Sequence, residues 1–394
     1  MNVGSSIFVQ LMDLAPRYEF NKCVSRWVGK YQAKKFSFWD QFLCMSFAQL
    51  THRESLRDIE TCLRATSSKL YHIGIRSKVS RSTLAEANNQ RDWRIFADFA
   101  LIMISEARKL YAGDEFGVEL ENSVYALDST VIDLCLTLFP WAQYNERSAG
   151  VRVNTLLDLR GSIPAFIHIS SQKTSELVAM DLIVPEPGSI YIFDRGYFDW
   201  GRLQRFTNAS AFFVTRGKKD LSFTRLYSNP VCKKANGILA DQIIVPNDPD
   251  SKRRYYNKVR RIKYVDNQTR NRLVFLTNNL SLPAETIAEL YRSRWNIELF
   301  FKWMKQHLRI KSFFGASENA VKTQIWIAVT TYVLVAILKK KLQLPQSLYT
   351  ILQFLSVTIF QKIPILQALS NDDYNYDADT NTNQLNLFNI PTGH

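Results

Sequence analysis

Between residues 124 and 215 the sequence alternates short apolar segments with turn-forming and helical ones. Val124 to Leu127 and Ile190 to Phe193 are apolar runs of strand length, and each stops at an aspartate. A hairpin is predicted between them, because a turn at residues 160–162 separates two further apolar segments. The predicted order is a strand, a hairpin, a short helix and two strands separated by a helix. This order favours a mixed α/β core.

The length and charge of the chain limit its organisation and its partners. At 394 residues it is too long for one simple core, and two or three domains are expected. It has 50 Lys and Arg against 36 Asp and Glu, a net charge of +14. Such an excess favours a polyanionic partner such as nucleic acid, although a basic protein without this partner has the same composition.

The cysteines and the apolar runs argue against a secreted or membrane protein. The five cysteines are scattered and form no Cys-x-x-Cys pair, which indicates reduced thiols in a cytoplasmic protein without zinc fingers. No secretory signal is expected at the N-terminus. The longest apolar run, Ile325 to Leu338, is shorter than a membrane span and contains Thr330 and Thr331. We therefore expect a buried helix there and no membrane partner.

Residues 1–115 have helical periodicity and are predicted to form an all-helical domain. Capping-box patterns that begin at Thr51 and Thr83 predict the start of two helices. The second helix would end in polar side chains at residues 88–91, and basic side chains precede it at residues 76–81. Two interpretations remain equally open, a helix-turn-helix-like DNA reader and a helical bundle with exposed polar side chains.

Residues 216–283 are predicted to form a β-rich insertion with a basic and aromatic face. Cations and rings alternate in it, namely Lys252, Arg253, Arg254, Tyr255, Tyr256, Arg260 and Arg261. Interleaved cations and rings suit a DNA backbone and an unstacked base. A solvated, charged hairpin is the alternative.

The stretch from Tyr291 to Lys305 is predicted to be one helix that begins after Pro283. At about 100° per residue, Arg294, Glu298 and Lys305 fall on a stripe about 60° wide, beside an apolar stripe. A carboxylate flanked by a phenol, a guanidinium and an ammonium suits a divalent metal beside phosphate. A surface set of ion pairs is an equal alternative on this helix alone.

The spacing of these four residues resembles the Tyr-Arg-Glu-Lys (YREK) signature of one family of bacterial insertion-sequence DDE transposases. Tyr291, Arg294, Glu298 and Lys305 match that signature at every position. The stretch SRSTLAEAN also resembles the N-terminal domain of this family. The resemblance covers roughly residues 80–340. It implies three metal-binding acids, which are Asp128, Asp194 and Glu298.

The chemistry of such a family explains why three acids are wanted. Two Mg²⁺ ions, with Mn²⁺ able to substitute, would activate the attacking oxygen and neutralise charge on the leaving oxygen. Mg²⁺ prefers carboxylate oxygens, and Asp128 is expected to be shared between the two ions. Tyr291, Arg294 and Lys305 are expected to hold phosphates of the transposon end. Arg195 either does the same or forms a structural ion pair.

The expected fold is an RNase H-like α/β core with an inserted β-rich region, preceded by an all-helical DNA-binding domain. The expected bounds are a helical domain at 1–115, a core at 116–215 and 284–345, an insertion at 216–283 and a tail at 346–394. Some relatives stack a flipped base on a tryptophan of the insertion. This chain has no tryptophan between Trp200 and Trp295, so Tyr255, Tyr256 and Phe275 are the candidates for that contact.

The expected function is that of a transposase acting on double-stranded DNA. It would bind the terminal inverted repeats of an insertion sequence, cleave at the element ends and join the 3′ ends to target DNA. The resemblance implies a homodimer on the DNA, in the bacterial cytoplasm and associated with the nucleoid. Two alternatives remain: a catalytically inactive DNA-binding protein, such as a decayed transposase or repressor, and a nuclease without strand transfer.

Overall fold

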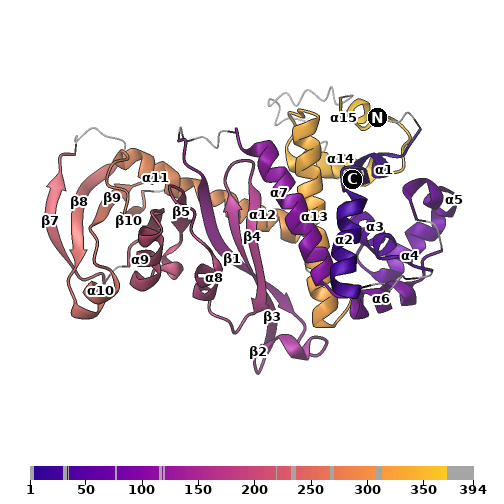
Figure 1. Cartoon of the computed structure of the whole chain (residues 1–394), viewed down its shortest axis with the longest axis horizontal. Coiled ribbons are helices and arrows are strands. Elements are labelled where there is room, and N and C mark those ends of the chain that lie inside the picture. The colour runs from indigo at the N-terminus through magenta and orange to yellow at the C-terminus, as the bar shows by residue number, and fades with distance from the viewer. Residues whose placement is uncertain are drawn as a thin grey trace, which may run out of the picture.

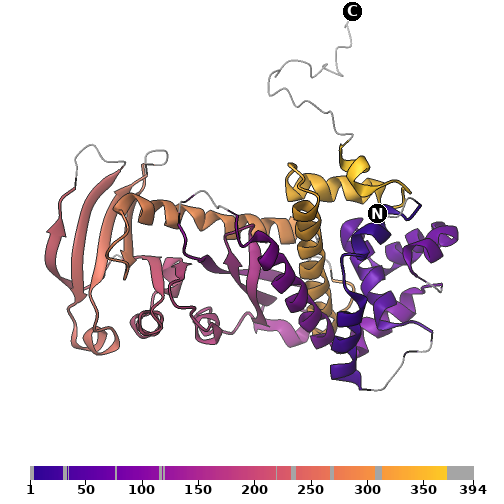
Figure 2. The same ribbon diagram turned by 45° about the horizontal axis from the view of Figure 1, so that its top comes forward.

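The computed structural model describes residues 4–29, 33, 35–75, 78–114, 118, 120–218, 220–231, 237–266, 270–306 and 313–370. Figure 1 and Figure 2 show an elongated molecule, with helices gathered at one end and one long sheet running to the other. Helix α7 (Arg94–Tyr111) lies beside α13 (Glu318–Lys341) where the two parts meet. The architecture is therefore mixed α/β, as predicted.

The first half of the sheet has the element order predicted from the sequence. Its strands are β1 (Val124–Leu134), β3 (Ser148–Asp158), β4 (Ile163–Ser171), β5 (Ile190–Phe193) and β6 (Phe212–Arg216). The intervening elements are α8 (Leu177–Leu182), η3 (Arg195–Tyr197) and α9 (Trp200–Asn208). Strands β1, β5 and β6 are parallel, whereas β3 is antiparallel to both β1 and β4. The order across the sheet is β4-β3-β1-β5-β6.

Strand β1 is longer than predicted. The sequence predicted a strand that stops at Asp128, but β1 continues to Leu134. The next residues, 130–132, are β-branched, and their backbone pairs with β3. Only the parallel pairing with β5 stops, at Leu127 opposite Phe193. Asp128 therefore lies inside a strand whose neighbour on one side has ended.

Residues 216–283 extend the same sheet. Their strands are β7 (Phe223–Asn229), β8 (Ile238–Pro246), β9 (Val259–Val265) and β10 (Arg272–Thr277). These strands are antiparallel neighbours, and β10 also pairs with β6. The basic residues 252–254 lie on a short helix, α10 (Pro249–Arg254), whose first turn is capped by Asp248. The region is β-rich as predicted, but its strands continue the core sheet. At the opposite end of the sheet, η2 (Pro140–Ala142) leads into β2 (Gln143–Asn145), which pairs with β3.

Both faces of the sheet are covered, which explains the continuous apolar runs in its parallel strands. Tyr191 and Phe193 of β5 pack on the face that α8 and α9 cover. Ile190 and Ile192, which alternate with them, belong to the core on the other face, together with side chains of α7 and α13. The alternation along β5 therefore feeds two separate apolar cores.

The secondary-structure elements among the described residues before Ala112 are all helices. The elements are α1 (Ile7–Met12), α2 (Arg17–Val28), α3 (Phe38–Leu50), α4 (Leu56–Ala65), α5 (Ser67–Leu70), η1 (Tyr71–Ile73), α6 (Arg81–Gln90) and α7. The capping boxes predicted at Thr51 and Thr83 are wrong. Thr51 ends α3, whereas the hydroxyls of Ser55 and Ser80 accept the N–H three residues later and cap α4 and α6. In each case a serine closer to the helix start supplies the cap.

Helices from the end of the chain complete this helical part. α14 (Leu348–Thr358) and α15 (Ile365–Ser370) follow α13, and α14 packs against both α13 and α3. The N–H groups of Ile7 and Phe8 donate to the carbonyls of Gln361 (2.9 Å) and Ile359 (3.0 Å). The segment predicted to be a tail from residue 346 is therefore structured and buried in part up to Ser370. Residues 371–394 lie outside the described part of the chain.

Helix α13 is the buried helix predicted from its apolar run. By length and composition it could cross a membrane, but 94% of its most apolar window is buried inside the protein. The Tyr111 hydroxyl of α7 donates to the carbonyl of Ala336 (2.8 Å), and the Tyr332 hydroxyl donates to that of Ser162 (2.8 Å). The helix thus ties the sheet to the helical part by packing and by hydrogen bonds.

We expect Gly161→Ala to destabilise the fold by about 2–5 kcal/mol. Gly161 lies in the predicted hairpin turn between β3 and β4, with φ of +70°, and an added Cβ would come within 2.2 Å of the Tyr111 ring. Backbone strain and overpacking would therefore add. Urea unfolding measures the loss. Gly113→Ala is the matched control, since nothing lies within 4 Å of its Cβ position, and equal stability of the two variants would contradict this account.

Candidate active site

The parallel pairing of β1 and β5 brings two aspartates to one edge of the sheet. Leu127 pairs with Phe193, so the next residue of each strand, Asp128 and Asp194, lies at the same level. Asp128 still pairs with Thr155 of β3, whereas Asp194 begins the turn of η3. The carboxyl edge of parallel strands is the usual place for a functional site in such sheets.

A third acid comes from a pair of helices, α11 (Ala284–Ser293) and α12 (Trp295–Gln306). The prediction of one helix from Tyr291 to Lys305 is wrong at one residue, Arg294, which lies between the two. The N–H of Arg294 donates to Tyr291 (3.2 Å) and that of Ile297 to Arg294 (3.1 Å), so bonds three residues apart tighten the junction. Arg294 keeps helical dihedral angles (φ −53°, ψ −28°), so the chain continues across the junction in a helical path.

The side chains around this junction contact all three acids. The Tyr291 hydroxyl donates to Oδ1 of Asp194 (2.9 Å). The Arg294 guanidinium donates through Nη1 to Oδ2 of Asp128 (3.1 Å) and through Nη2 to Oε1 of Glu298. The structure thus brings the predicted acids Asp128, Asp194 and Glu298 to one place. It also places Tyr291 and Arg294 on those acids, where the sequence predicted phosphate contacts.

Two further contacts to the acids were not predicted. Nη1 of Arg216, at the end of β6, lies 4.0 Å from Oδ1 of Asp194. Because β6 is parallel to β5, its last residue reaches the same edge of the sheet as Asp194. A cation at the end of the next parallel strand was the signal that could have identified it. The second contact is the backbone N–H of Ser129, which donates to Oδ1 of Asp128 (2.8 Å). No pattern in the sequence could have predicted it.

Burial and neighbouring charges shift the pKa values of the two aspartates in opposite directions. Burial raises the pKa of Asp128 to about 6, although the Ser129 N–H and Arg294 oppose the rise. Burial also acts to raise the pKa of Asp194. There the backbone N–H of Arg195, the Tyr291 hydroxyl and the guanidinium groups of Arg294 and Arg216 outweigh burial, so the pKa falls below its usual value. Asp194 is therefore the more firmly ionised of the two acids.

The donor atoms suit a divalent metal, but their arrangement does not match a metal centre. Three carboxylates are the ligands that Mg²⁺ prefers. Among the described residues, however, no three acid, histidine or cysteine side chains are placed to hold a metal ion. Oxygens of Asp128 and Glu298 already accept hydrogen bonds from Arg294. As the side chains lie, the guanidinium occupies the place between these two acids.

The other predicted contacts with DNA near the acids are Arg195 and Lys305. Arg195 directly follows Asp194, is exposed and forms no ion pair with any residue in the described ranges, so the alternative of a structural ion pair finds no support there. Lys305 is half-buried on α12, about two turns beyond Glu298. Both lie on the elements that supply the acids.

The cations predicted on the insertion fall into two groups. Lys252 and Arg253 are exposed on α10, and Arg254 beside them pairs with Asp199. Arg260 is a wrong prediction, because it is buried and donates through Nη2 to Asp241 (2.7 Å) in a structural ion pair. Arg261 is half-buried and donates to Gln242 (2.8 Å). Burial of the paired guanidinium leaves Arg260 unable to reach a ligand.

The aromatic candidates for base stacking also divide by burial. Tyr255 is fully buried beneath α9, and Phe275 packs against Tyr291 with ring centroids 4.8 Å apart. Tyr256 is 68% exposed, next to the basic helix α10. Only Tyr256 of the three could meet a base without unfolding part of the core.

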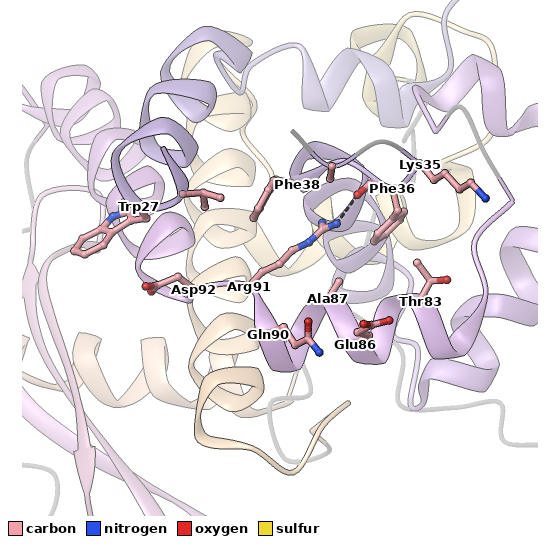
Figure 3. A pocket seen from close by; sticks show the side chains of 12 residues that line it. Trp27, Lys35, Phe36, Phe38, Thr83, Glu86, Ala87, Gln90, Arg91 and Asp92 are labelled. Atoms are coloured by element: carbon pink, nitrogen blue, oxygen red, sulfur yellow. Dashed lines mark hydrogen bonds between the residues drawn. The ribbon is translucent and has the colours of Figure 1, made fainter. Parts of the chain in front are cut away.

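A pocket in the helical part lies away from the acids. It has a volume of about 500 Å³ between the end of α2, residues 35–38 and α6. Figure 3 shows Arg91 reaching between Phe36 and Phe38. Arg91 donates to the carbonyls of Phe36 and Ser37 (2.8 Å to the latter), so it is structural. The side chain of Asn88 is also buried, bonded to Gln41, which leaves residues 81–83, 86, 89 and 90 as the exposed polar face of α6.

We expect Asp128→Asn to raise the free energy of unfolding at pH 8 by up to about 3 kcal/mol, because its pKa rises about two units on folding. A raised carboxyl pKa favours the protonated folded state, so the wild type loses stability as the pH rises from 3.8 to about 6. The advantage of the variant should shrink over the same range on acidification. Urea unfolding between pH 4.5 and pH 8 measures it.

The matched control for this substitution is Asp133→Asn, on the same strand but exposed, which should leave stability unchanged. An Asp128→Asn variant less stable than the wild type at pH 8 would contradict the account of a costly buried charge.

Known proteins with similar sequences are transposases. A family model described as a transposase DDE domain matches residues 119–334, and one described as a domain of unknown function (DUF4372) matches residues 3–76. "Putative transposase y4zB" of Sinorhizobium fredii is 33% identical over 260 residues, which are 64% of this chain and 70% of that protein. The match to the transposase DDE domain covers more than half of the chain and includes Asp128, Asp194 and Glu298.

Two further relatives are named for insertion sequences. "Probable transposase for insertion sequence element IS5377" of Geobacillus stearothermophilus is 30% identical over 213 residues, 53% of this chain and 54% of that protein. "Putative transposase for insertion sequence element IS4SA" of Synechocystis sp. is 24% identical over 366 residues, 91% of this chain and 96% of that protein. The chain therefore belongs to the DDE-domain transposases of bacterial insertion sequences.

Proposed function

We propose that this transposase binds the terminal inverted repeats of its insertion sequence, cleaves at the element ends and joins the 3′ ends to target DNA. The observation that supports this is the convergence of Asp128, Asp194 and Glu298 from three separate elements. A structural ion-pair network has no need of three acids at the carboxyl edge of parallel strands. Phosphoryl transfer does, because it must neutralise charge on phosphate.

The sheet supports the proposal of an RNase H-like core. In that proposal β1, β3 and β4 form the antiparallel part and β5 and β6 the parallel part, in the order β4-β3-β1-β5-β6. Residues 216–283 are then an insertion that widens the sheet after β6, and α11 to α13 complete the core. The helical part, residues 1–115, would be the region that recognises DNA, through the exposed polar face of α6.

The three acids would hold Mg²⁺, or Mn²⁺ in its place, once Arg294 gives up its contacts with them. The bound ions would activate the attacking oxygen and stabilise the leaving one. Asp194 is ionised over the physiological range, since the pKa of its carboxyl is lowered. The charges of both Asp194 and Glu298 act on Asp128, which supports Asp128 as the ligand shared between the two ions.

DNA would be held by cations around the acids and along α10. Tyr291, Arg294, Lys305 and Arg195 surround the acids, and membership of the YREK group would give them the phosphates of the transposon end. Lys252, Arg253 and Arg254 on α10, with Tyr256 beside them, offer a second contact with the backbone. The net charge of +14 agrees with a polyanionic partner. A homodimer on the DNA, in the cytoplasm and at the nucleoid, completes the proposal.

We expect Glu298→Gln and Asp128→Asn to lower cleavage at the inverted-repeat boundary by at least about 100-fold while binding of the same DNA persists. Each change removes a carboxylate and retains the shape of the side chain. The assay uses labelled DNA with the flanking inverted repeats and Mg²⁺, and it separates cut from joined products. Glu289→Gln on the exposed face of α11 is the matched control and should cleave like the wild type.

The same assay distinguishes the alternatives. Specific binding without cutting by the wild type, in Mg²⁺ or Mn²⁺, would assign a DNA-binding protein without catalysis. Cutting without joined products would assign a nuclease. Cleavage retained by Glu298→Gln would remove the acid of α12 from the site.

A further inference from the structure

The contacts of Arg294 bear on how the acids can receive a metal ion. Its guanidinium lies between carboxylates of different elements, Asp128 of β1 and Glu298 of α12. Its side chain is only 16% exposed, so these contacts are largely shielded from water. We propose that Arg294 is an internal counter-cation that closes the acids to divalent metal until a DNA phosphate draws it away, so that DNA and metal bind cooperatively. This inference rests on the proposed function.

A metal ion and Arg294 compete for the same oxygens. Oδ2 of Asp128 and Oε1 of Glu298 accept from Nη1 and Nη2 of the guanidinium. An ion held at those oxygens would displace the guanidinium, and an ion held at the other oxygens of these acids would stand next to a positive group. A guanidinium does not lose its proton in proteins, so it can make room only by moving. Metal binding is therefore favoured when Arg294 releases both acids.

The contacts of Arg294 leave its Nε donor unused. It meets each carboxylate through a single Nη, whereas the strongest geometry is a fork of two parallel hydrogen bonds to one anion. Its Nε is buried and has no hydrogen-bond partner in the part of the chain that the structure describes. An unpaired buried donor is costly. A backbone phosphate, with two free oxygens, could accept from Nε and one Nη together.

The surroundings of Arg294 suit a phosphodiester. The same helical junction also engages the third acid, because the Tyr291 hydroxyl donates to Asp194. Arg195, exposed next to Asp194, and Lys305, farther along α12, lie on the elements that hold the acids. A DNA strand neutralised by these cations would bring its phosphates to Arg294. Asp128 and Glu298, once released, would then have free oxygens and would no longer share the charge of Arg294, which favours a divalent ion.

Such coupling is reciprocal. If DNA increases metal affinity by some factor, metal must increase DNA affinity by the same factor, and typical factors are about 5–150. A variant without the guanidinium should bind metal well in the absence of DNA and should gain little when DNA is added. That pattern separates an internal counter-cation from a residue that only contributes to DNA affinity.

The test measures Mn²⁺ binding by the electron paramagnetic resonance signal of the free ion. This readout does not depend on catalysis. The full chain is titrated alone and with an inverted-repeat duplex whose 3′ ends are dideoxynucleotides, so that no strand can be joined. We expect the duplex to tighten Mn²⁺ binding by the wild type at least about 5-fold. Arg294→Gln should bind Mn²⁺ at least about 5-fold more tightly than the wild type without DNA, with under 2-fold further gain from the duplex.

Two variants control for charge and for the metal site. Arg292→Gln removes the same charge two residues away, where Arg292 donates to the Tyr264 hydroxyl (2.7 Å), and should behave like the wild type. The double variant Asp128→Asn, Glu298→Gln lacks two of the three acids, so its titration with the duplex measures the Mn²⁺ that the duplex itself binds. If Arg294→Gln does not fold, Arg294→Lys replaces it, since one ammonium cannot reproduce both contacts, and it too should tighten Mn²⁺ binding without DNA.

The possible outcomes separate the inference from the proposed function. Equal Mn²⁺ affinity of the wild type with and without duplex, at the three acids, would overturn the inference and leave the metal-dependent function standing. The same is true if the Arg294 variants bind Mn²⁺ no more tightly than the wild type, or if Arg292→Gln tightens binding as much as they do. No Mn²⁺ at the acids in any protein, with or without duplex, would overturn both.

Discussion

The parallel pairing of β1 with β5 determines where the proposed chemistry would take place in this protein. This pairing ends at Leu127 and Phe193, and the two aspartates that follow do not pair with each other. Everything else in the site is built against this edge. The junction of α11 and α12 lies over it and adds Glu298, and β6, next in the parallel set, adds Arg216. Packing of α13 against α7 joins this sheet to the helical part, so the edge has a fixed relation to the face of α6.

Gathering three carboxylates at a buried edge has an electrostatic cost that the protein meets with its own cations and donors. Burial raises the pKa of Asp128, and the neighbouring acids raise it further. Arg294, Tyr291 and Arg216 offset part of that cost, and in doing so they engage the oxygens that a metal would need. In the proposed mechanism, the arrangement that makes the fold tolerate its acids is thus the arrangement that has to open for catalysis. Stability and activity make opposite demands on Arg294.

Three errors of sequence-based prediction have a common physical cause. Arg260 was expected to bind DNA, but the antiparallel pairing of β8 with β9 places Asp241 beside it and buries both. Tyr255 was expected to be available to a base, but it fills the core under α9. Strand β1 was expected to end at Asp128, but β3 supplies backbone partners for it as far as Leu134. In each case the deciding partner lies on another element, where local periodicity has no information.

The sequence by itself determined the residue types of the site, the order of strands and helices and the helical stripe that includes Glu298. These are properties of neighbours along the chain, set by apolar periodicity and by spacing. Only the tertiary structure decided which charge meets which. Arg294 contacts Asp128 across 166 positions of sequence, and Tyr291 contacts Asp194 across 97. Such pairings depend on how the helices pack over the sheet edge, because opposite charges lower their energy with whichever partner that packing brings within reach.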